Sequence, residues 1–421
     1  AAEPRYQGAG SAMVTATRLD NSLDEICSAT TGKVTYSAGF STIAEAPAKD
    51  IARLRAEAVA AATDADVAVV FLGLPAHAES EGYDRDDIDL PAPQLALIDA
   101  VLDVNPNTVV VLSNGGVVAL PFAATVPAIV EGWLLGQAGG GATADVLFGD
   151  VNPSGKLAET IPLRLSDTPS YLDFPGEFSH VRYSEGLFVG YRWYDARGIE
   201  VAFPFGHGIS YTTFTYGTAA AAVNDDGDID VRVAVTNAGA VAGREVVQAY
   251  TSLPGGKVQR PPRELKAFAS VDLAAGETRD VLLTIRRKDL AYWDIRVESW
   301  IVEGGSYLID IAASSRDLRS SVHVGVDGDD VVIPLSRSST IGEVMAHPVA
   351  GPMVEAAFAA KEGEMRDAAA IMPEGVGISR MLESFPIGKV GMFGVDVDLA
   401  MIDALLAAAN AGVAATSIPK G

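Results

Sequence analysis

Residues 66–74 read D-V-A-V-V-F-L-G-L, a nearly unbroken apolar run from Asp66 to Leu74. A run of this length, rich in β-branched valine, is typical of a strand that is covered on both faces. Such strands occur in mostly parallel sheets, with helices packed on each side. The run therefore predicts an α/β domain, and we expect helices and further strands in the sequence around it.

The flanking sequence alternates between helical and strand patterns. Ala46–Thr63 is alanine-rich with charges at helical spacing, and Pro93–Val104 has apolar residues on one face, so both predict helices. Thr108–Leu112 and Pro127–Leu134 predict two more buried strands. Gly139–Gly149 predicts a helix closed by its last glycine. Strands and helices that alternate with short links predict βαβ units and a mostly parallel sheet.

The pattern divides the chain into four parts. Residues 1–150 are expected to form the α/β sandwich domain, and residues 151–216, rich in Pro, Gly and aromatic residues, an irregular connecting segment packed on it. In residues 217–326 the apolar residues recur with a period of two, which predicts an immunoglobulin- or fibronectin III-like β-sandwich. Residues 327–421 are expected to form a partly helical tail. The expected sandwich strands are Asp228–Thr236, Glu245–Ser252, Arg279–Ile285 and Ser306–Ala313, and the expected tail helices are Gly342–Ala360 and Asp396–Asn410.

The composition excludes several classes of function. With 31 Lys and Arg against 55 Asp and Glu, the net charge of −24 argues against nucleic acid and an anionic membrane surface as partners. No apolar run reaches the roughly 18 residues of a membrane span. Cys27 is the single cysteine and the five histidines are scattered, so we expect no disulfide, no metal site and no cofactor. The compartment and the oligomeric state stay open, although the tail could cover a second subunit in a homodimer.

The acidic stretch Glu79-Ser80-Glu81-Gly82-Tyr83-Asp84-Arg85 follows the first buried strand. Ligands bind at the carboxyl ends of strands in open α/β sheets, so its carboxyls are candidates for acid/base chemistry on a sugar-like substrate. Glu81 precedes a glycine that would let a substrate approach closely. Glu79 and Asp84 could raise the pKa of such an acid, and Arg85 could lower it. The alternative is that this stretch is only an acidic surface loop.

Three other features have plainer interpretations. The glycine cluster at residues 136–141 follows a strand and opens a helix, which allows phosphate binding, but its spacing fits a tight turn better. His77 beside the acidic loop could be a base or a surface residue. Ser113 ends the second buried strand but lacks the sequence context of a hydrolase nucleophile. A nucleotide-binding protein is thus a weak alternative.

Several segments together resemble the C-terminal half of glycoside hydrolase family 3, the β-glucosidase and β-xylosidase family. They follow one another in family order over roughly residues 4–320. They are Pro4-Arg5-Tyr6-Gln7-Gly8-Ala9-Gly10-Ser11, the Glu79–Arg85 stretch, Asp150-Val151-Asn152-Pro153-Ser154-Gly155-Lys156-Leu157, Glu185-Gly186-Leu187-Phe188-Val189-Gly190-Tyr191-Arg192-Trp193-Tyr194-Asp195, Pro204-Phe205-Gly206-His207-Gly208-Ile209-Ser210-Tyr211 and Arg263-Glu264-Leu265-Lys266-Ala267-Phe268.

This resemblance implies an α/β sandwich domain followed by a fibronectin type III-like domain, and a retaining exo-acting β-glycosidase, in the first place a β-glucosidase. It places the general acid/base at Glu81 and a leaving-group contact at Tyr83, and we expect Glu79 and Arg85 to bind substrate. The nucleophilic Asp of the family lies in a TIM-like barrel, which is expected on a preceding segment or another chain, as is the first strand of the sheet. Ala138 stands where the family often has Glu. The alternatives are a β-xylosidase of the same family and a non-catalytic carbohydrate-binding or assembly module.

Overall fold

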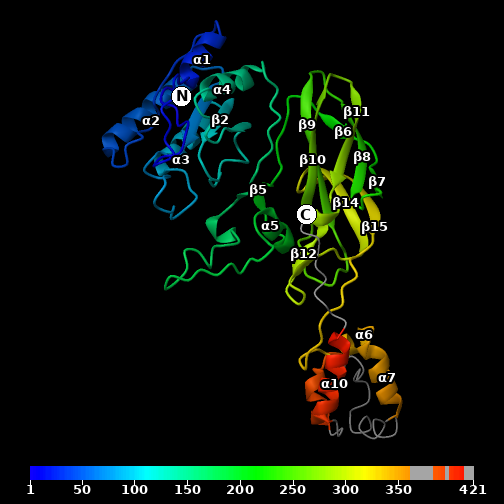
Figure 1. Ribbon diagram of the computed structural model, residues 1–421. Coiled ribbons are helices and arrows are strands. Elements are labelled where there is room, and N and C mark those ends of the chain that lie inside the picture. Colours follow the sequence, from blue (N-terminus) through cyan, green and yellow to red (C-terminus); the bar gives the residue numbers. More distant parts are fainter. Residues whose placement is uncertain (361–382, 394–397, 412–421) are drawn as a thin grey trace. The chain divides into compact units, whose positions relative to one another are not determined.

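The computed structural model describes residues 1–360, 383–393 and 398–411 of the chain (Figure 1). Two compact units are present. The first contains residues Ala1–Arg286 and Ser306–Gly325, and the second contains Arg287–Gly305 and Val326–Gly421. The α/β sheet, the connecting segment and most of the β-sandwich belong to the first unit. Within the described residues, no helix has both the length and the apolar character that a membrane crossing requires.

The first unit opens with a three-stranded parallel sheet in the order β1-β2-β3. Its strands are β1 (Ala68–Gly73), β2 (Thr108–Ser113) and β3 (Ala128–Glu131). Val70 pairs with Val110, and Val110 pairs with Ile129, so the three strands end at one common edge. The expected parallel sheet is confirmed. In β1, however, buried and half-buried residues alternate, so its two faces are not covered equally.

Four helices accompany this sheet: α1 (Ser22–Ala29), α2 (Ala48–Thr63), α3 (Ala92–Leu102) and α4 (Gly139–Phe148). Helix α1 packs against α4, and α2 packs against α3 (Figure 1). A Cβ atom on Gly140 would lie 2.7 Å from the backbone of Asn21, the N-cap of α1, so glycine permits this close approach. The core lies between helices and sheet, with Ile98 and Leu112 fully buried.

The connecting segment contains short elements that pack on both neighbouring domains. These are β4 (Ile161–Pro162), the 3₁₀ turn η1 (Leu165–Asp167), α5 (Tyr191–Arg197) and β5 (Val201–Phe203). The ring of Tyr191 stacks on Phe205 at 4.7 Å and meets the buried Tyr250 of the β-sandwich edge-on. The Lys156 ammonium lies 2.9 Å from the Glu245 carboxylate, and both side chains are largely buried. Aromatic packing and ion pairs, which include Arg316 with Asp195 at 2.8 Å, thus bind this segment to the sandwich.

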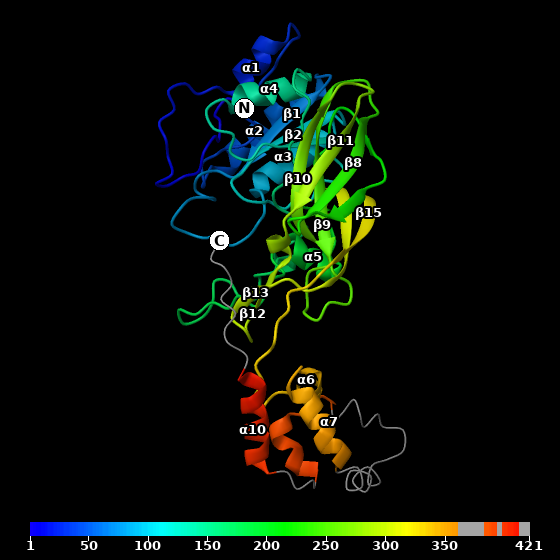
Figure 2. The same cartoon turned by 45° about the vertical axis from the view of Figure 1, so that its right-hand side comes forward.

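The sandwich has two antiparallel sheets (Figure 2). One has the order β10-β9-β14-β15, and the other has the order β11-β8-β6 with β7 paired to β8. Alternate residues of β8 from Ile229 to Val235 are almost completely buried, as the period of two predicted. The strands are β6 (Phe214–Tyr216), β7 (Ala220–Val223), β8 (Ile229–Asn237), β9 (Gly243–Ser252), β10 (Glu264–Leu273), β11 (Thr278–Ile285), β14 (Gly305–Ser314) and β15 (Asp317–Val326).

The second unit contains a two-stranded hairpin and the helical tail. Its elements are η2 (Arg287–Leu290), β12 (Tyr292–Asp294), β13 (Ser299–Ile301), α6 (Ile341–Ala346), α7 (Ala350–Ala360), η3 (Ile387–Phe393) and α10 (Leu399–Asn410). The expected single helix Gly342–Ala360 is two helices, because Pro348 cannot continue the backbone hydrogen bonds of α6. Part of the other expected helix, Asp396–Asn410, lies outside the described residues, and α10 begins after the N-cap Asp398.

Candidate functional site

The acidic loop begins where β1 ends, at the carboxyl edge of the parallel sheet. The backbone amide of Leu74 donates to the carbonyl of Ser113, the last residue of β2, at 3.2 Å. A turn then follows, in which the amides of Ala78 and Glu79 both donate to the Pro75 carbonyl. The loop therefore lies at the edge at which open α/β sheets bind ligands.

Glu79 binds the loop to the end of the neighbouring strand. Its two carboxylate oxygens accept hydrogen bonds from the backbone amides of Gly115 and Gly116, at 2.7 and 2.9 Å. Arg5 donates to the Glu79 carbonyl at 2.9 Å and lies 4.0 Å from the carboxylate. Both carboxylate oxygens are thus engaged with the protein itself.

Arg85 and Tyr83 make further contacts with the backbone around the loop. The Arg85 guanidinium donates to the Val117 carbonyl at 2.9 Å, on the segment that follows Gly116. The Tyr83 hydroxyl donates to the Ala76 carbonyl at 3.0 Å, while half of this residue is exposed. His77 is exposed in the same loop. The loop is therefore held on both sides of Glu81.

Glu81 is exposed and meets the N-terminal segment of the chain. Its carboxylate accepts hydrogen bonds from the Ser11 backbone amide, at 2.6 Å, and from the Ser11 hydroxyl. Its own amide donates to the Ala9 carbonyl at 3.2 Å. Gly10 has a φ of +93°, and a Cβ there would lie only 2.6 Å from the Cβ of Glu81. Only glycine lets this segment pack on Glu81.

The hydrogen bonds from Ser11 also set the charge state of Glu81. The Ser11 hydroxyl and then the Ser11 amide lower the pKa of Glu81 below its ordinary value, because they stabilise the charged form. Both hydrogen bonds therefore favour the ionised form of Glu81. Sequence reasoning did not identify Ser11 as its partner, since the two residues are 70 positions apart.

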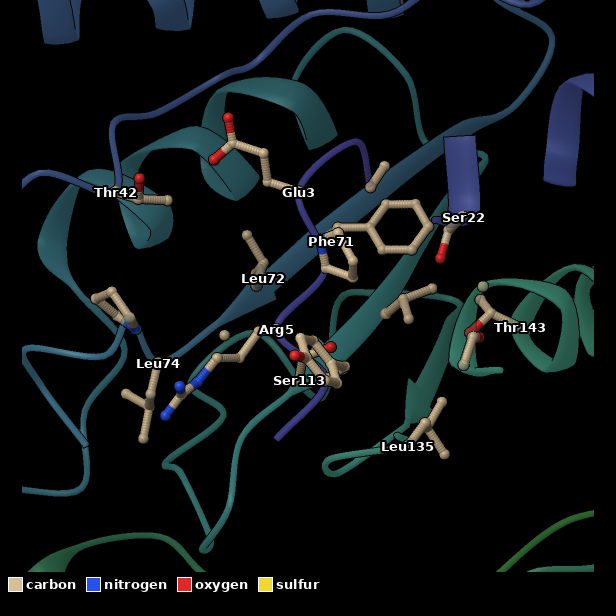
Figure 3. Close-up of a pocket in the computed structure, with 18 of the residues that line it drawn as sticks. Glu3, Arg5, Ser22, Thr42, Phe71, Leu72, Leu74, Ser113, Leu135 and Thr143 are labelled. Carbon is tan, nitrogen blue, oxygen red and sulfur yellow. The ribbon is translucent and has the colours of Figure 1, made fainter. Parts of the chain in front are cut away.

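A cavity of about 130 Å³ lies near the loop, between β1, β2 and α4 (Figure 3). Phe71, Ser113 and Thr143 line it together with Arg5, whereas Glu81 is not among its lining residues. The glycine cluster beside it forms a turn, in which the Gly136 amide donates to the Tyr6 carbonyl at 2.9 Å. These residues pack the N-terminal segment onto the sheet.

A further carboxyl at this edge was not identified in the sequence. Glu131 is the last residue of β3, and its Oε1 accepts from the Trp133 backbone amide at 3.0 Å. Burial raises the pKa of Glu131 to about 7, against hydrogen bonding from Trp133 and from the Asn114 side chain. The available signal was an acidic residue at the end of an apolar run.

The family follows from the sequence match. The model of the glycosyl hydrolase family 3 C-terminal domain matches residues 1–211, half of the chain. The chain belongs to glycosyl hydrolase family 3. A fibronectin type III-like domain matches residues 245–315. The acidic loop thus lies in the family 3 C-terminal domain, and the β-sandwich contains the fibronectin type III-like domain, as the resemblance predicted.

Relatives of this family 3 chain are glycosidases. A thermostable β-glucosidase B of Acetivibrio thermocellus is 49% identical over 329 residues, which are 76% of this chain and 43% of that protein. An exo-α-(1→6)-L-arabinopyranosidase of Bifidobacterium longum is 43% identical over 389 residues, 92% of this chain and 50% of that protein. The crystal structure of a family 3 β-glucosidase of Bifidobacterium adolescentis has 44% identity and a TM-score of 0.77, over 83% of this chain and 51% of that one. The chain therefore spans about half the length of these relatives.

Proposed function

We propose that this chain supplies the general acid/base of a retaining, exo-acting β-glycosidase, with Glu81 in that role and β-glucosides as substrates. The observation that carries the proposal is an exposed carboxylate at the carboxyl edge of the sheet, on a loop fixed by Glu79 on one side and Arg85 on the other. The β-glucosidase relatives support the substrate class. A TIM-like barrel, as a further domain or a partner chain, supplies the Asp nucleophile.

The mechanism assigns two steps to Glu81. It first protonates the glycosidic oxygen of the leaving group, while the barrel Asp attacks the anomeric carbon and forms a glycosyl-enzyme. The resulting Glu81 carboxylate then removes a proton from water, which releases the sugar with retained configuration. This double displacement requires the two carboxyl groups to lie about 5–5.5 Å apart. It requires no metal and no organic cofactor.

The lowered pKa of Glu81 suits the second step and opposes the first. A general acid must hold its proton, and Ser11 favours the ionised form. An Asp nucleophile brought to within about 5.5 Å adds a negative charge, which raises the pKa of Glu81. Once the nucleophile is glycosylated its charge is lost, and Glu81 becomes the ionised base. In this proposal Ser11 favours the ionised form of Glu81, and the charge of the barrel Asp, present in the first step and absent in the second, changes the protonation of Glu81 between the two steps.

The neighbouring side chains have separate roles in this proposal. Tyr83 presents its half-exposed ring to the leaving group, because its hydroxyl is fixed to the Ala76 carbonyl. Glu79 and Arg85 position the loop through the backbone groups that they bind. Direct contact of Glu79 or Arg85 with substrate stays a prediction.

The test uses Glu81→Ala in a preparation that contains the barrel and hydrolyses aryl β-glucosides. We expect kcat/KM to fall by about 10²–10⁴ for poor leaving groups and far less for activated ones, which need little protonation. Azide, a nucleophile that needs no base, is expected to restore turnover and to yield the β-glycosyl azide. Asp86→Ala, which removes an exposed carboxyl of the same loop, is the matched control. An equal relative loss for both kinds of leaving group would show that Glu81 is not the acid/base.

A second candidate substrate is an α-L-arabinopyranoside, because a relative with that activity in its name aligns with 92% of this chain. A β-xyloside is the third. Comparing kcat/KM on the three matched aryl glycosides, with each sugar on the same leaving group, selects among them. If none is hydrolysed, calorimetric titration with glucose or cellobiose tests the remaining alternative, a carbohydrate-binding or assembly module.

A further inference from the structure

The connecting segment contains an arm, residues 171–190, that exposes large apolar side chains to solvent. All residues of the arm are described, and none belongs to a helix or a sheet, so the arm runs as a loop between η1 and α5 (Figures 1 and 2). Apolar groups gathered in this way on one exposed segment are typical of a surface that a partner covers. The exposed residues that bear on its role are Leu172, Phe174, Phe178, Val181, Tyr183 and Leu187.

Hydrogen bonds between the two sides of the arm give it a defined shape. At its base, Trp193 Nε1 donates to the Asp167 carbonyl at 3.1 Å, which joins the residues just before and just after the arm. Further along, the Ser184 hydroxyl donates to the Asp173 carboxylate. Both contacts close the arm upon itself, so its backbone is ordered before a partner binds.

The tip of the arm displays Phe178 in an uncommon backbone conformation. The amides and carbonyls of Glu177 and His180 bond to each other, at 2.9 Å in both directions, around a two-residue turn. Phe178 and Ser179 form that turn with φ values of +51° and +63°. Such a turn normally contains Asn-Gly, because residues with larger side chains rarely adopt positive φ. Strained positions of this kind concentrate at binding sites, and here the strain presents a phenylalanine that is 94% exposed.

The side chains of the arm fit a protein surface better than a glycan or a membrane. Leu172, Val181 and Leu187 are aliphatic, so they offer a sugar neither a hydrogen bond nor a ring on which to stack. The net charge of −24 argues against an anionic membrane surface. Aromatic anchors such as Phe178 and Tyr183, together with apolar contacts that exclude water, are typical of the centre of a protein interface.

The relatives indicate which protein surface the arm would meet. The chain matches the model of a family 3 C-terminal domain, and it spans 50% of the arabinopyranosidase and 51% of the β-glucosidase of known structure. The proposed function assigns the nucleophile to a barrel outside the matched half. We propose that the arm docks on this barrel, with Phe178 as its anchor, and so fixes the barrel relative to the acidic loop. This interaction surface rests on the proposed function of Glu81.

A shaped and firmly rooted arm suits this task, because the double displacement tolerates little movement. The nucleophile and Glu81 must lie about 5–5.5 Å apart, and a misplacement of about 1 Å can cost about a hundredfold in rate. The arm leads directly into α5, whose Tyr191 packs on Phe205 and on the buried Tyr250 of the sandwich. A barrel bound to the arm is thereby connected to the packed core of this unit.

The first test places the photo-crosslinking residue p-benzoylphenylalanine at position 178, in a preparation that contains the barrel and hydrolyses aryl β-glucosides. The matched control carries it in place of Leu282, which is 71% exposed on β11. After irradiation and digestion, we expect mass spectrometry to find position 178 joined to peptides of the barrel, and position 282 joined to none of them. Crosslinks from position 178 to a second copy of this chain, or no crosslinks from either position, would overturn the proposal.

The second test is Phe178→Asp in the same preparation. An undocked barrel misplaces the nucleophile itself, so kcat/KM is expected to fall at least about tenfold for good and poor leaving groups alike. Glu81→Ala differs, because it spares activated substrates. Leu282→Asp is the control and is expected to stay within about twofold of wild type. If Phe178→Asp is as active as Leu282→Asp, Phe178 is not the anchor.

Crosslinking and kinetics together separate the two proposals. Barrel crosslinks from position 178, in a preparation whose activity does not need Glu81, would overturn the proposed function while the docking surface stands. A loss of activity in Glu81→Ala that depends on the leaving group, without barrel crosslinks from position 178, would overturn the docking surface and leave the proposed function intact.

Discussion

Removal of the Glu79 carboxylate should destabilise the first unit and misplace Glu81. The two hydrogen bonds from Gly115 and Gly116 are charge-assisted and short, at 2.7 and 2.9 Å. Bonds of this kind contribute about 1.5–3 kcal/mol each. The ion pair with Arg5, at 4.0 Å and partly exposed, adds at most about 1 kcal/mol. Gly115 is exposed, so in a Glu79 variant water can accept the hydrogen bond of the Gly115 amide and replace part of the lost interaction.

We therefore expect Glu79→Ala to lower the free energy of unfolding by about 2–4 kcal/mol. Glu79→Gln keeps one oxygen acceptor, and we expect about half that loss. Urea titration, with unfolding followed by circular dichroism, measures both, and Asp86→Asn is the exposed control on the same loop. In the active preparation both variants should lose kcat/KM, more strongly for poor leaving groups, because a displaced Glu81 protonates them less well.

The result that would refute this reasoning is specific. If Glu79→Ala unfolds within about 0.5 kcal/mol of wild type yet loses activity, the anchoring hydrogen bonds contribute little to stability. Glu79 would then act by direct contact with the substrate, the other role that the sequence allowed. A rise in KM with unchanged kcat would point the same way, since it reports lost binding that is equal in ground and transition states.

Two further predictions concern Ser11 and the ion pair of Lys156. Ser11→Ala removes a hydrogen bond that favours ionised Glu81, so the pKa of Glu81 should rise. The alkaline limb of the pH profile of kcat/KM should then move to higher pH. An unchanged alkaline limb would mean that another group sets it. Glu245→Gln removes the negative charge opposite the largely buried Lys156 ammonium, which keeps only neutral acceptors such as the Gly208 carbonyl at 2.8 Å, and should cost about 3–5 kcal/mol in urea unfolding. The double variant Lys156→Met with Glu245→Leu should recover most of that loss.

The sequence predicted those strands in which the buried residues form a clear pattern along the chain. The branched apolar residues of β2 and the alternating residues of β8 are examples, and both strands formed within a residue or two of the expected bounds. Strands β10 and β15 were not assigned from the pattern. In β10 half-buried residues occur on both faces and few are fully buried, so apolar and polar residues do not alternate cleanly. Partial burial on two faces removes the signal on which such predictions depend.

The candidate site was predicted only as far as local sequence can reach. The position of the acidic loop at the sheet edge follows from the strand before it. The different environments of Glu79 and Glu81 do not, because Glu79 is bound by residues 36 and 37 positions ahead and Glu81 by a residue 70 positions behind. Contacts between residues so far apart in the sequence depend on the tertiary fold, which local patterns do not encode. The resemblance to the family predicted Glu81 as the acid/base, but could not show what holds it.

Three glutamates at one sheet edge illustrate why residue type alone did not decide function. Glu79 is fixed by two backbone amides, Glu81 is exposed with a pKa lowered by Ser11, and Glu131 is half-buried with a pKa raised to about 7. The same carboxyl group is thus an anchor at Glu79, an exposed group with a lowered pKa at Glu81, and a partly buried group with a raised pKa at Glu131. Of the three, Glu81 is the exposed residue, whereas Glu79 and Glu131 are partly covered by the protein. Its environment, more than its place in an acidic run, makes Glu81 the candidate acid/base.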